Sequence, residues 1–140
     1  ETAMQYLLWA LQILLALAFL GSGAIKLTQP YDALAAQIVW VPAVPEPLIR
    51  FIGLAEVLGS LGLILPAATR IQPWLTPLAA AGLALTMLLA TGFHLMRGEL
   101  TLAIPSTVLL LLSAFVAYGR RSLVPIAPRG TAQTTPAIAV

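Results

Sequence analysis

Four long apolar runs separated by short polar turns constrain this chain more than any other feature. Each run has close to the roughly 20 residues that a helix needs to cross the hydrocarbon core of a bilayer, and together with their turns they use up most of the 140 residues. Composition agrees, because 60% of the residues are apolar and 9% are charged, against about 45–50% and 25% in soluble domains. The sequence predicts an all-α, integral membrane four-helix bundle.

The runs are bounded by prolines, charges and glycines. We expect membrane spans at about residues 4–26, 48–65, 74–96 and 102–118. Together they form a single membrane domain over residues 4–121, with Pro66 ending the second span. Residues 1–3 precede the first methionine and look like an expression remnant. Residues 122–140 are rich in Pro, Thr and Ala, and we expect them to form a flexible tail.

The connection between the first two spans, residues 27–47, is long enough for structure of its own. Apolar side chains recur in it at helical spacing, at Tyr31, Leu34, Ile38 and Val41. This pattern predicts a short interfacial amphipathic segment between helices 1 and 2, and Trp40 is a residue type that suits that depth. The segment is either an ordinary interfacial loop or a lid over a ligand site, and the sequence leaves both open.

Several classes of site are excluded by residue counts. The chain has no cysteine and a single histidine, so disulfides, thiol chemistry and a multi-histidine metal site built by one chain are ruled out. Its seven Lys and Arg residues are scattered. We therefore expect no metal site and no nucleic-acid surface.

Four spans place both chain termini on one side of the membrane, together with the loop at residues 66–73. That side carries Arg70, Arg120, Arg121 and Arg129, and the opposite side carries Lys26, Arg50 and Arg97. The positive-inside rule then favours cytoplasmic termini. We interpret Arg70, Arg97, Arg120 and Arg121 as topology anchors.

The same topology brings one group of polar residues to a single membrane face. The end of the first span carries Lys26, the start of the second carries Arg50 and Glu56, and the end of the third carries His94. The polar residues of the first span also share one helical seam, which runs through Gln5, Trp9, Gln12, Ala16, Phe19, Gly23 and Lys26.

Glu56 shares its helical face with Gly53, Gly59 and Ser60, so it points into the bundle. A carboxylate there needs a partner, and Lys26 or His94 is better placed than Arg50. The group is either a buried ion pair that fixes helix register or a functional site. In the functional interpretation Glu56 and His94 are candidates for a proton relay. The candidate ligand-binding residues are Lys26, Trp40, Arg50, Glu56 and His94.

Three segments carry a resemblance to a known family. They are Gly23–Leu27 at the end of the first span, Gly53–Leu63 in the second, and His94 late in the third. In this order and spacing, within a small four-span chain, they resemble the DoxX and DoxX-like family. The resemblance implies links to membrane oxidoreductase assemblies of the bacterial inner membrane, including a quinone-reducing one, while more distant relatives look like trafficking receptors and chaperones. It also implies that Lys26, Glu56 and His94 form the family's polar site.

Two functions of different kinds follow. The first is a membrane subunit that binds a quinone or a small lipid and works with a redox partner chain, because no flavin, haem or iron–sulfur motif is recognisable here. The second is a non-enzymatic scaffold or chaperone whose polar cluster is structural. A small transporter is a third, less favoured function, since four spans are few for a carrier with inverted repeats. Ala55 and Gly59 fit packing within one bundle or in a homo-oligomer, and whether the chain is catalytic stays open.

Overall fold

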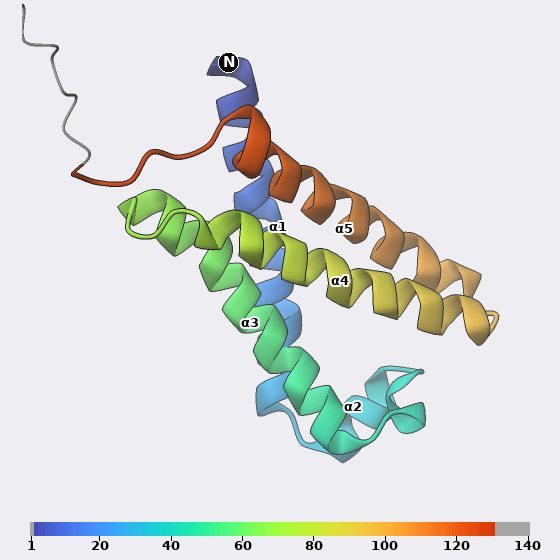
Figure 1. The fold of residues 1–140 in the computed structure, drawn as a ribbon. Helices are drawn as coiled ribbons and strands as arrows, with labels where there is room; N and C mark the ends of the chain where they lie inside the picture. Colours follow the sequence, from blue (N-terminus) through green and yellow to red (C-terminus); the bar gives the residue numbers. More distant parts are fainter. Residues whose placement is uncertain (1, 131–140) are drawn as a thin grey trace, which may run out of the picture.

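Four long helices, arranged as two crossing pairs, dominate the computed structural model, which describes residues 2–130 (Figure 1). Their bounds are α1 (Thr2–Thr28), α3 (Glu46–Thr69), α4 (Leu75–Met96) and α5 (Leu100–Tyr118). By length and composition all four could span a membrane, so the predicted all-α membrane bundle is confirmed. Thr2 and Ala3, which we read as part of a remnant, form the first turn of α1.

Pro66 lies inside α3, so our expectation that it ends the second span was wrong. A proline inside a helix has no N–H to give to the carbonyl four residues earlier, which here is the carbonyl of Gly62. The Thr76 hydroxyl of α4 donates to that carbonyl at 2.8 Å. Because α4 supplies the missing donor, α3 continues to Thr69 and ends at Arg70, whose φ of 59° is left-handed.

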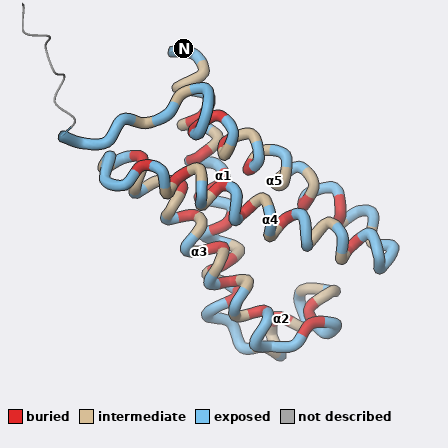
Figure 2. Tube along the Cα trace, in the orientation of Figure 1, coloured by how far each residue is buried: buried red, intermediate tan, exposed pale blue. Residues whose placement is uncertain are grey.

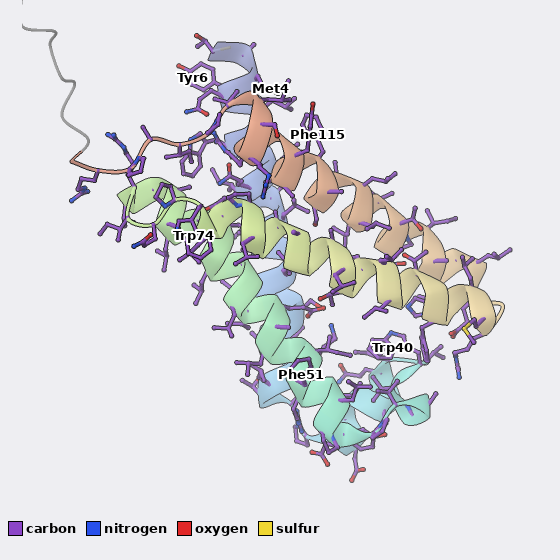
Figure 3. All side chains as sticks on the ribbon, viewed as in Figure 1. Met4, Tyr6, Trp40, Phe51, Trp74 and Phe115 are labelled. Carbon is purple, nitrogen blue, oxygen red and sulfur yellow. The ribbon has the colours of Figure 1, made fainter. Side chains whose placement is uncertain are left out.

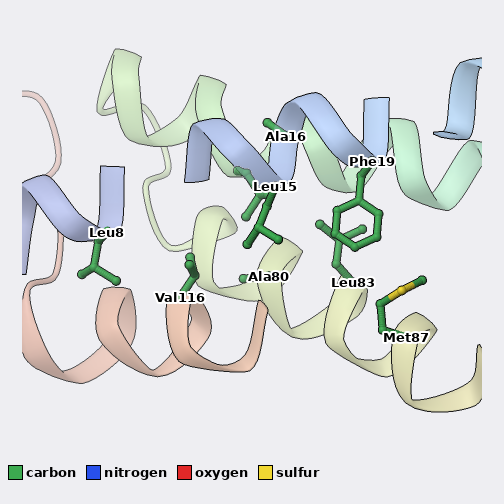
Figure 4. Packing of buried hydrophobic residues seen from close by; sticks show 9 residues of the cluster. Leu8, Leu15, Ala16, Phe19, Ala80, Leu83, Met87 and Val116 are labelled. Carbon is green, nitrogen blue, oxygen red and sulfur yellow. The ribbon is translucent and has the colours of Figure 1, made fainter. Parts of the chain in front are cut away.

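The helices pack as α1 against α3 and α4 against α5, and α3 also packs against α4 (Figure 1). The two pairs cross near the beginning of α1 and diverge toward the end of α4. An apolar core lies where they cross and includes Leu8, Leu15, Phe19, Leu83 and Val116 (Figure 4). Many large apolar side chains on the outer helix faces are exposed (Figure 2), as expected for surfaces that contact lipid.

The helical segment predicted between the first two long helices is present as the short helix α2 (Tyr31–Gln37) and the 3-10 turn η1 (Val41–Ala43), while its place at a membrane interface stays a prediction. Its apolar stripe has a small core of its own, in which Leu34, Val41 and Ile49 are fully buried. The Tyr31 hydroxyl donates to the carbonyls of Val41 and Val44 at 3.3 and 3.1 Å. These contacts make the segment a packed element and place Trp40 at its edge (Figure 3).

The chain continues beyond α5 as the π-helical turn η2 (Gly119–Leu123). Residues 124–130 then run past the turn between α3 and α4 as an extended strap (Figure 1). The backbone N–H of Arg129 donates to the Arg70 carbonyl at 2.8 Å, and Arg70 Nε donates to the Ala127 carbonyl at 2.8 Å. The segment that we expected to be a flexible tail therefore begins with residues packed on the bundle. Its remainder, residues 131–140, lies outside the described residues.

Candidate functional site: a Lys–Glu pair under Trp40 and His94

Two glycines allow α1 and α3 to cross closely enough for their charges to meet. A Cβ atom added at Gly23 would lie 2.7 Å from the Gly53 carbonyl oxygen, and one at Gly53 would lie 2.8 Å from the Lys26 Cβ. Both distances are shorter than van der Waals contact, so this crossing requires glycine on each helix. Small residues bring helix backbones together in lipid, and here they place Lys26 beside Glu56.

Lys26 and Glu56 form a buried ion pair. The Lys26 Nζ lies 3.0 and 3.1 Å from the two carboxylate oxygens of Glu56, and it donates to the Ser22 hydroxyl at 2.5 Å. The two residues are 7% and 2% exposed. Of the two partners that we expected for Glu56, the structure selects Lys26. A pair so sequestered balances its own charge, which a lone carboxylate in a membrane helix could not do.

Arg50 lies beside this pair but does not contact the Glu56 carboxylate. Its Nη1 donates to the carbonyls of Lys26 and Gln29, both at 2.7 Å, and its Nη2 lies 3.0 Å from a carboxylate oxygen of Glu46. The last carbonyls of a helix lack partners within the helix. Arg50 supplies donors at the end of α1 and fixes where the chain turns toward α2.

Trp40 connects the ion pair to the end of α4. The Lys26 Nζ lies 6.0 Å from the centre of the Trp40 ring, at the outer limit of a cation–π contact. The same ring meets His94 edge to face at a centroid distance of 6.0 Å and Phe93 at 6.2 Å. We call Lys26, Trp40, Glu56 and His94 the Lys26 cluster.

His94 is buried at the end of α4 and pairs outward, toward the turn between α4 and α5. Its Nδ1 lies 3.4 Å from Glu99 Oε1, and Arg97 Nε donates to the same oxygen at 2.7 Å. The hydrogen bond from Arg97 lowers the pKa of Glu99 below its ordinary value; burial opposes this shift and His94 adds to it. Lys26, Arg50, Glu56 and His94, which we predicted to converge, thus lie at the same end of the bundle. Arg50 binds backbone carbonyls there, and His94 is connected to the Lys26–Glu56 pair through the Trp40 ring.

This arrangement combines hydrogen-bond donors, proton-exchanging groups and aromatic faces at one end of the bundle. Lys26, Trp40 and His94 are the residues best placed to hold a cofactor with carbonyl groups and a flat ring. A groove of about 390 Å³ between α3 and α4, and one of about 940 Å³ at the other end of the molecule, include none of the Lys26 cluster. Among residues 2–130, no three His, Asp or Glu side chains come together as metal ligands.

A second polar cluster was missed by the sequence reasoning. Arg120, which we interpreted as a topology anchor, is 2% exposed. Its Nε donates to Gln12 Oε1 at 2.6 Å, its Nη1 donates to Gln5 Oε1, and its guanidinium lies 5.4 Å from the centre of the Trp9 ring. Gln12 Nε2 in turn donates to the Leu63 carbonyl at 2.6 Å. The sequence signal that could have revealed this cluster is the pair Gln5 and Gln12 on the inner seam of the first span. Their side-chain oxygens need a hydrogen-bond donor inside the bundle.

Comparison with known proteins gave one match. The model of the DoxX-like family matches residues 10–116, a range that includes every residue of the Lys26 cluster. Comparisons with curated proteins and with solved structures gave no match.

Proposed function

The chain belongs to the DoxX-like family, and we propose that it is a membrane subunit that binds a quinone, or a small lipid with similar polar groups, at the Lys26 cluster. The observation that carries this proposal is the placement of Trp40, whose ring lies 6.0 Å from both the Lys26 Nζ and the His94 ring. A flat ligand inserted beside Trp40 would find an aromatic face, the Lys26 ammonium, which could exchange its hydrogen bond to Ser22 for one to a carbonyl, and the His94 ring. These are the features that recognise quinone carbonyls.

The charge balance of the cluster also favours an uncharged ligand. Lys26 and Glu56 neutralise each other at 3.0 Å, so a neutral carbonyl compound can approach without leaving a net charge buried. Reduction of a bound quinone would take up two protons, for which Glu56 and His94 are the candidates, and two electrons, which a separate redox partner would supply. In this proposal the chain is one part of an oxidoreductase assembly.

The test is quenching of tryptophan fluorescence in the full chain, reconstituted in nanodiscs and titrated with decylubiquinone. We expect saturable quenching that Trp40→Phe removes and Trp74→Phe retains, because Trp74 is an exposed residue at the other end of the bundle. His94→Leu should weaken binding about tenfold by removing the imidazole and its hydrogen-bonding nitrogens. Quenching that is linear in quinone concentration, or equal in the two tryptophan variants, would mean contact through the bilayer and would refute the proposal.

A second function, a membrane scaffold or chaperone, is favoured by one specific observation. The ion pair lies directly at the Gly23–Gly53 crossing, which is where a purely structural lock between α1 and α3 would be placed. In that case purified chain should carry one dominant partner protein, and replacing both charges with Lys26→Met and Glu56→Leu should leave partner binding intact while decylubiquinone causes no saturable quenching.

For the orientation, we propose cytoplasmic termini in a plasma (inner) membrane. On the opposite side Lys26, Arg50 and Arg97 each face a carboxylate, that of Glu56, Glu46 and Glu99 respectively, whereas the four arginines predicted for the terminal side face none among residues 2–130. The excess of free positive charge then lies with the termini, as the positive-inside rule requires. Labelling of a cysteine introduced in the 97–99 turn by an impermeant reagent added outside intact cells would support this orientation, and protection there would contradict it.

A further inference from the structure

A groove of about 940 Å³ opens at the end of the bundle opposite the Lys26 cluster. One wall is the first turns of α4, with Trp74, Leu78 and Ala81, and another is the end of α5 with Tyr118. The strap closes it through Ile126. The strap is held by the bonds between Arg70 and the backbone of Ala127 and Arg129, so the groove is preformed in the folded chain.

The charge of this groove is positive and uncompensated. Arg70, Arg120, Arg121 and Arg129 line it, and no carboxylate does. Within residues 2–130, every Asp and Glu lies elsewhere: Glu56 pairs with Lys26, Asp32 lies in α2, Glu46 begins α3, and Glu99 lies in the turn between α4 and α5. The arginines therefore lack an acidic partner in the part of the chain that the structure describes.

Arg120 gives the sharpest indication that the groove suits an anion. It is 2% exposed, its described partners are two amide oxygens, a backbone carbonyl and the Trp9 ring, and its buried Nη2 has no hydrogen-bond partner. A buried guanidinium without an anion is costly, and Arg120 lines the groove, where a bound anion would balance its charge. Arginine forks match the oxygens of phosphate closely.

The apolar part of the groove identifies the ligand further. Leu78 and Ala81 belong to the membrane-spanning part of α4, so the groove continues from the arginines toward the depth of the acyl chains. A small soluble anion would leave this apolar wall uncovered. Basic pockets of this kind between membrane helices bind anionic lipid headgroups.

We propose that this groove is a binding site for one anionic phospholipid of the leaflet on the terminal side. Its phosphate would lie among Arg120, Arg121 and Arg129, and its first acyl carbons would lie against Leu78 and Ala81. The site is separate from the Lys26 cluster, and its existence does not depend on quinone binding.

Native mass spectrometry of the full chain in detergent tests this site with phosphatidylglycerol and phosphatidylcholine of identical acyl chains. We expect one phosphatidylglycerol per chain to be retained in preference to phosphatidylcholine. Removing two exposed arginines together, Arg121→Gln with Arg129→Gln, should lower the relative affinity for phosphatidylglycerol roughly 25-fold, since each basic residue at a membrane surface contributes a factor of about five. Arg97→Gln, an exposed arginine at the other end, is the matched control and should change nothing.

A second variant, Ala81→Phe, keeps every charge and fills the apolar wall. It should also reduce retention of phosphatidylglycerol. Equal retention of the two lipids, an equal loss in Arg97→Gln, or unchanged retention in both groove variants would overturn the proposal. Displacement of the lipid by millimolar inorganic phosphate would show that the groove takes free phosphate, and would overturn the assignment to a lipid.

Discussion

Two buried polar clusters lie toward opposite ends of the bundle, and they balance charge in different ways. In the Lys26 cluster a cation meets a carboxylate at 3.0 Å, and the net charge is zero. In the other, which we call the Arg120 cluster and which consists of Gln5, Gln12 and Arg120, a cation meets amide oxygens and keeps its charge. Both are anchored on the same seam of α1.

This difference in charge balance determines which ligands each end can bind. A balanced pair accepts a neutral ligand without creating a buried charge, whereas an unbalanced guanidinium with an unpartnered Nη2 is completed by an anion. Quinone carbonyls fit the first description and a lipid phosphate fits the second. Substitutions at each end of the bundle test this distinction.

Glu56→Gln should have the largest effect on stability, because it strands the Lys26 ammonium in a buried site. Removing one partner of a buried pair costs about 3–5 kcal/mol, which we expect in the free energy of unfolding measured by titration with a denaturing detergent. The double variant Lys26→Met and Glu56→Leu removes both charges and should recover most of the loss. If the double variant were as unstable as the single one, charge balance would not explain this end of the bundle.

Arg120→Met should cost less, about 1–3 kcal/mol, because it strands the carbonyl oxygens of Gln5 and Gln12 but no charge. The neighbouring exposed Arg121→Met is the control and should change the free energy of unfolding by less than about 0.5 kcal/mol. The same detergent titration measures both variants. An Arg120→Met loss larger than that of Glu56→Gln would contradict the distinction between the two clusters.

Substitution of glycines also distinguishes the two ends, because a Cβ atom added at Gly53 would meet less movable atoms than one added at Gly119. Gly53→Ala would place a Cβ 2.8 Å from the Lys26 Cβ and 3.0 Å from the Gly23 carbonyl oxygen, whereas Gly119→Ala would meet the flexible end of Leu8. We expect a loss of about 1–3 kcal/mol for Gly53→Ala and a smaller one for Gly119→Ala. Gly92→Ala, which meets no atom within 4 Å, should be neutral or slightly stabilising. Equal losses at Gly53 and Gly119 would contradict a tighter crossing at the Lys26 end.

The smallest effect concerns pH at the outer edge of the Lys26 cluster. The pKa of Glu99 is lowered below its ordinary value of 4.5, chiefly by Arg97. A depressed carboxyl pKa stabilises the folded chain above that ordinary value, and the stabilisation is lost as the pH falls through the folded pKa. Unfolding midpoints measured between about pH 3 and pH 6 should show a shallow acid loss that Arg97→Gln reduces. An unchanged profile in Arg97→Gln would rule out Arg97 as its cause.

Much of this fold could be predicted because apolar runs and helical seams are local signals. Four spans, the amphipathic segment at Tyr31 and the inward direction of Glu56 follow from spacing alone. Pro66 could not be placed correctly, because its tolerance depends on the Thr76 hydroxyl of another helix. The order of the strap was hidden for the same reason, since it rests on bonds to Arg70, far away in the sequence.

The candidate site was predictable in its members but not in its connections. Lys26, Glu56 and His94 were brought together by topology, yet the geometry pairs Lys26 with Glu56 and directs His94 toward Glu99. Arg120 was misread because arginines at the end of a span so often mark topology. Only the positions of Gln5 and Gln12 on the inner seam indicated that one such arginine is buried in the bundle.

The Lys26–Glu56 pair also has a consequence for how the protein is made. Synthesis proceeds from the N-terminus, so α1 reaches the membrane with Lys26 before α3 has delivered Glu56. A lysine at the end of a span can extend its side chain to the headgroups, where its ammonium stays hydrated until a partner is available. Glu56, deeper in its helix, finds its partner already in place on arrival. The order of the two charges along the chain thus suits membrane insertion, because Lys26, which can remain hydrated without its partner, is synthesised before Glu56.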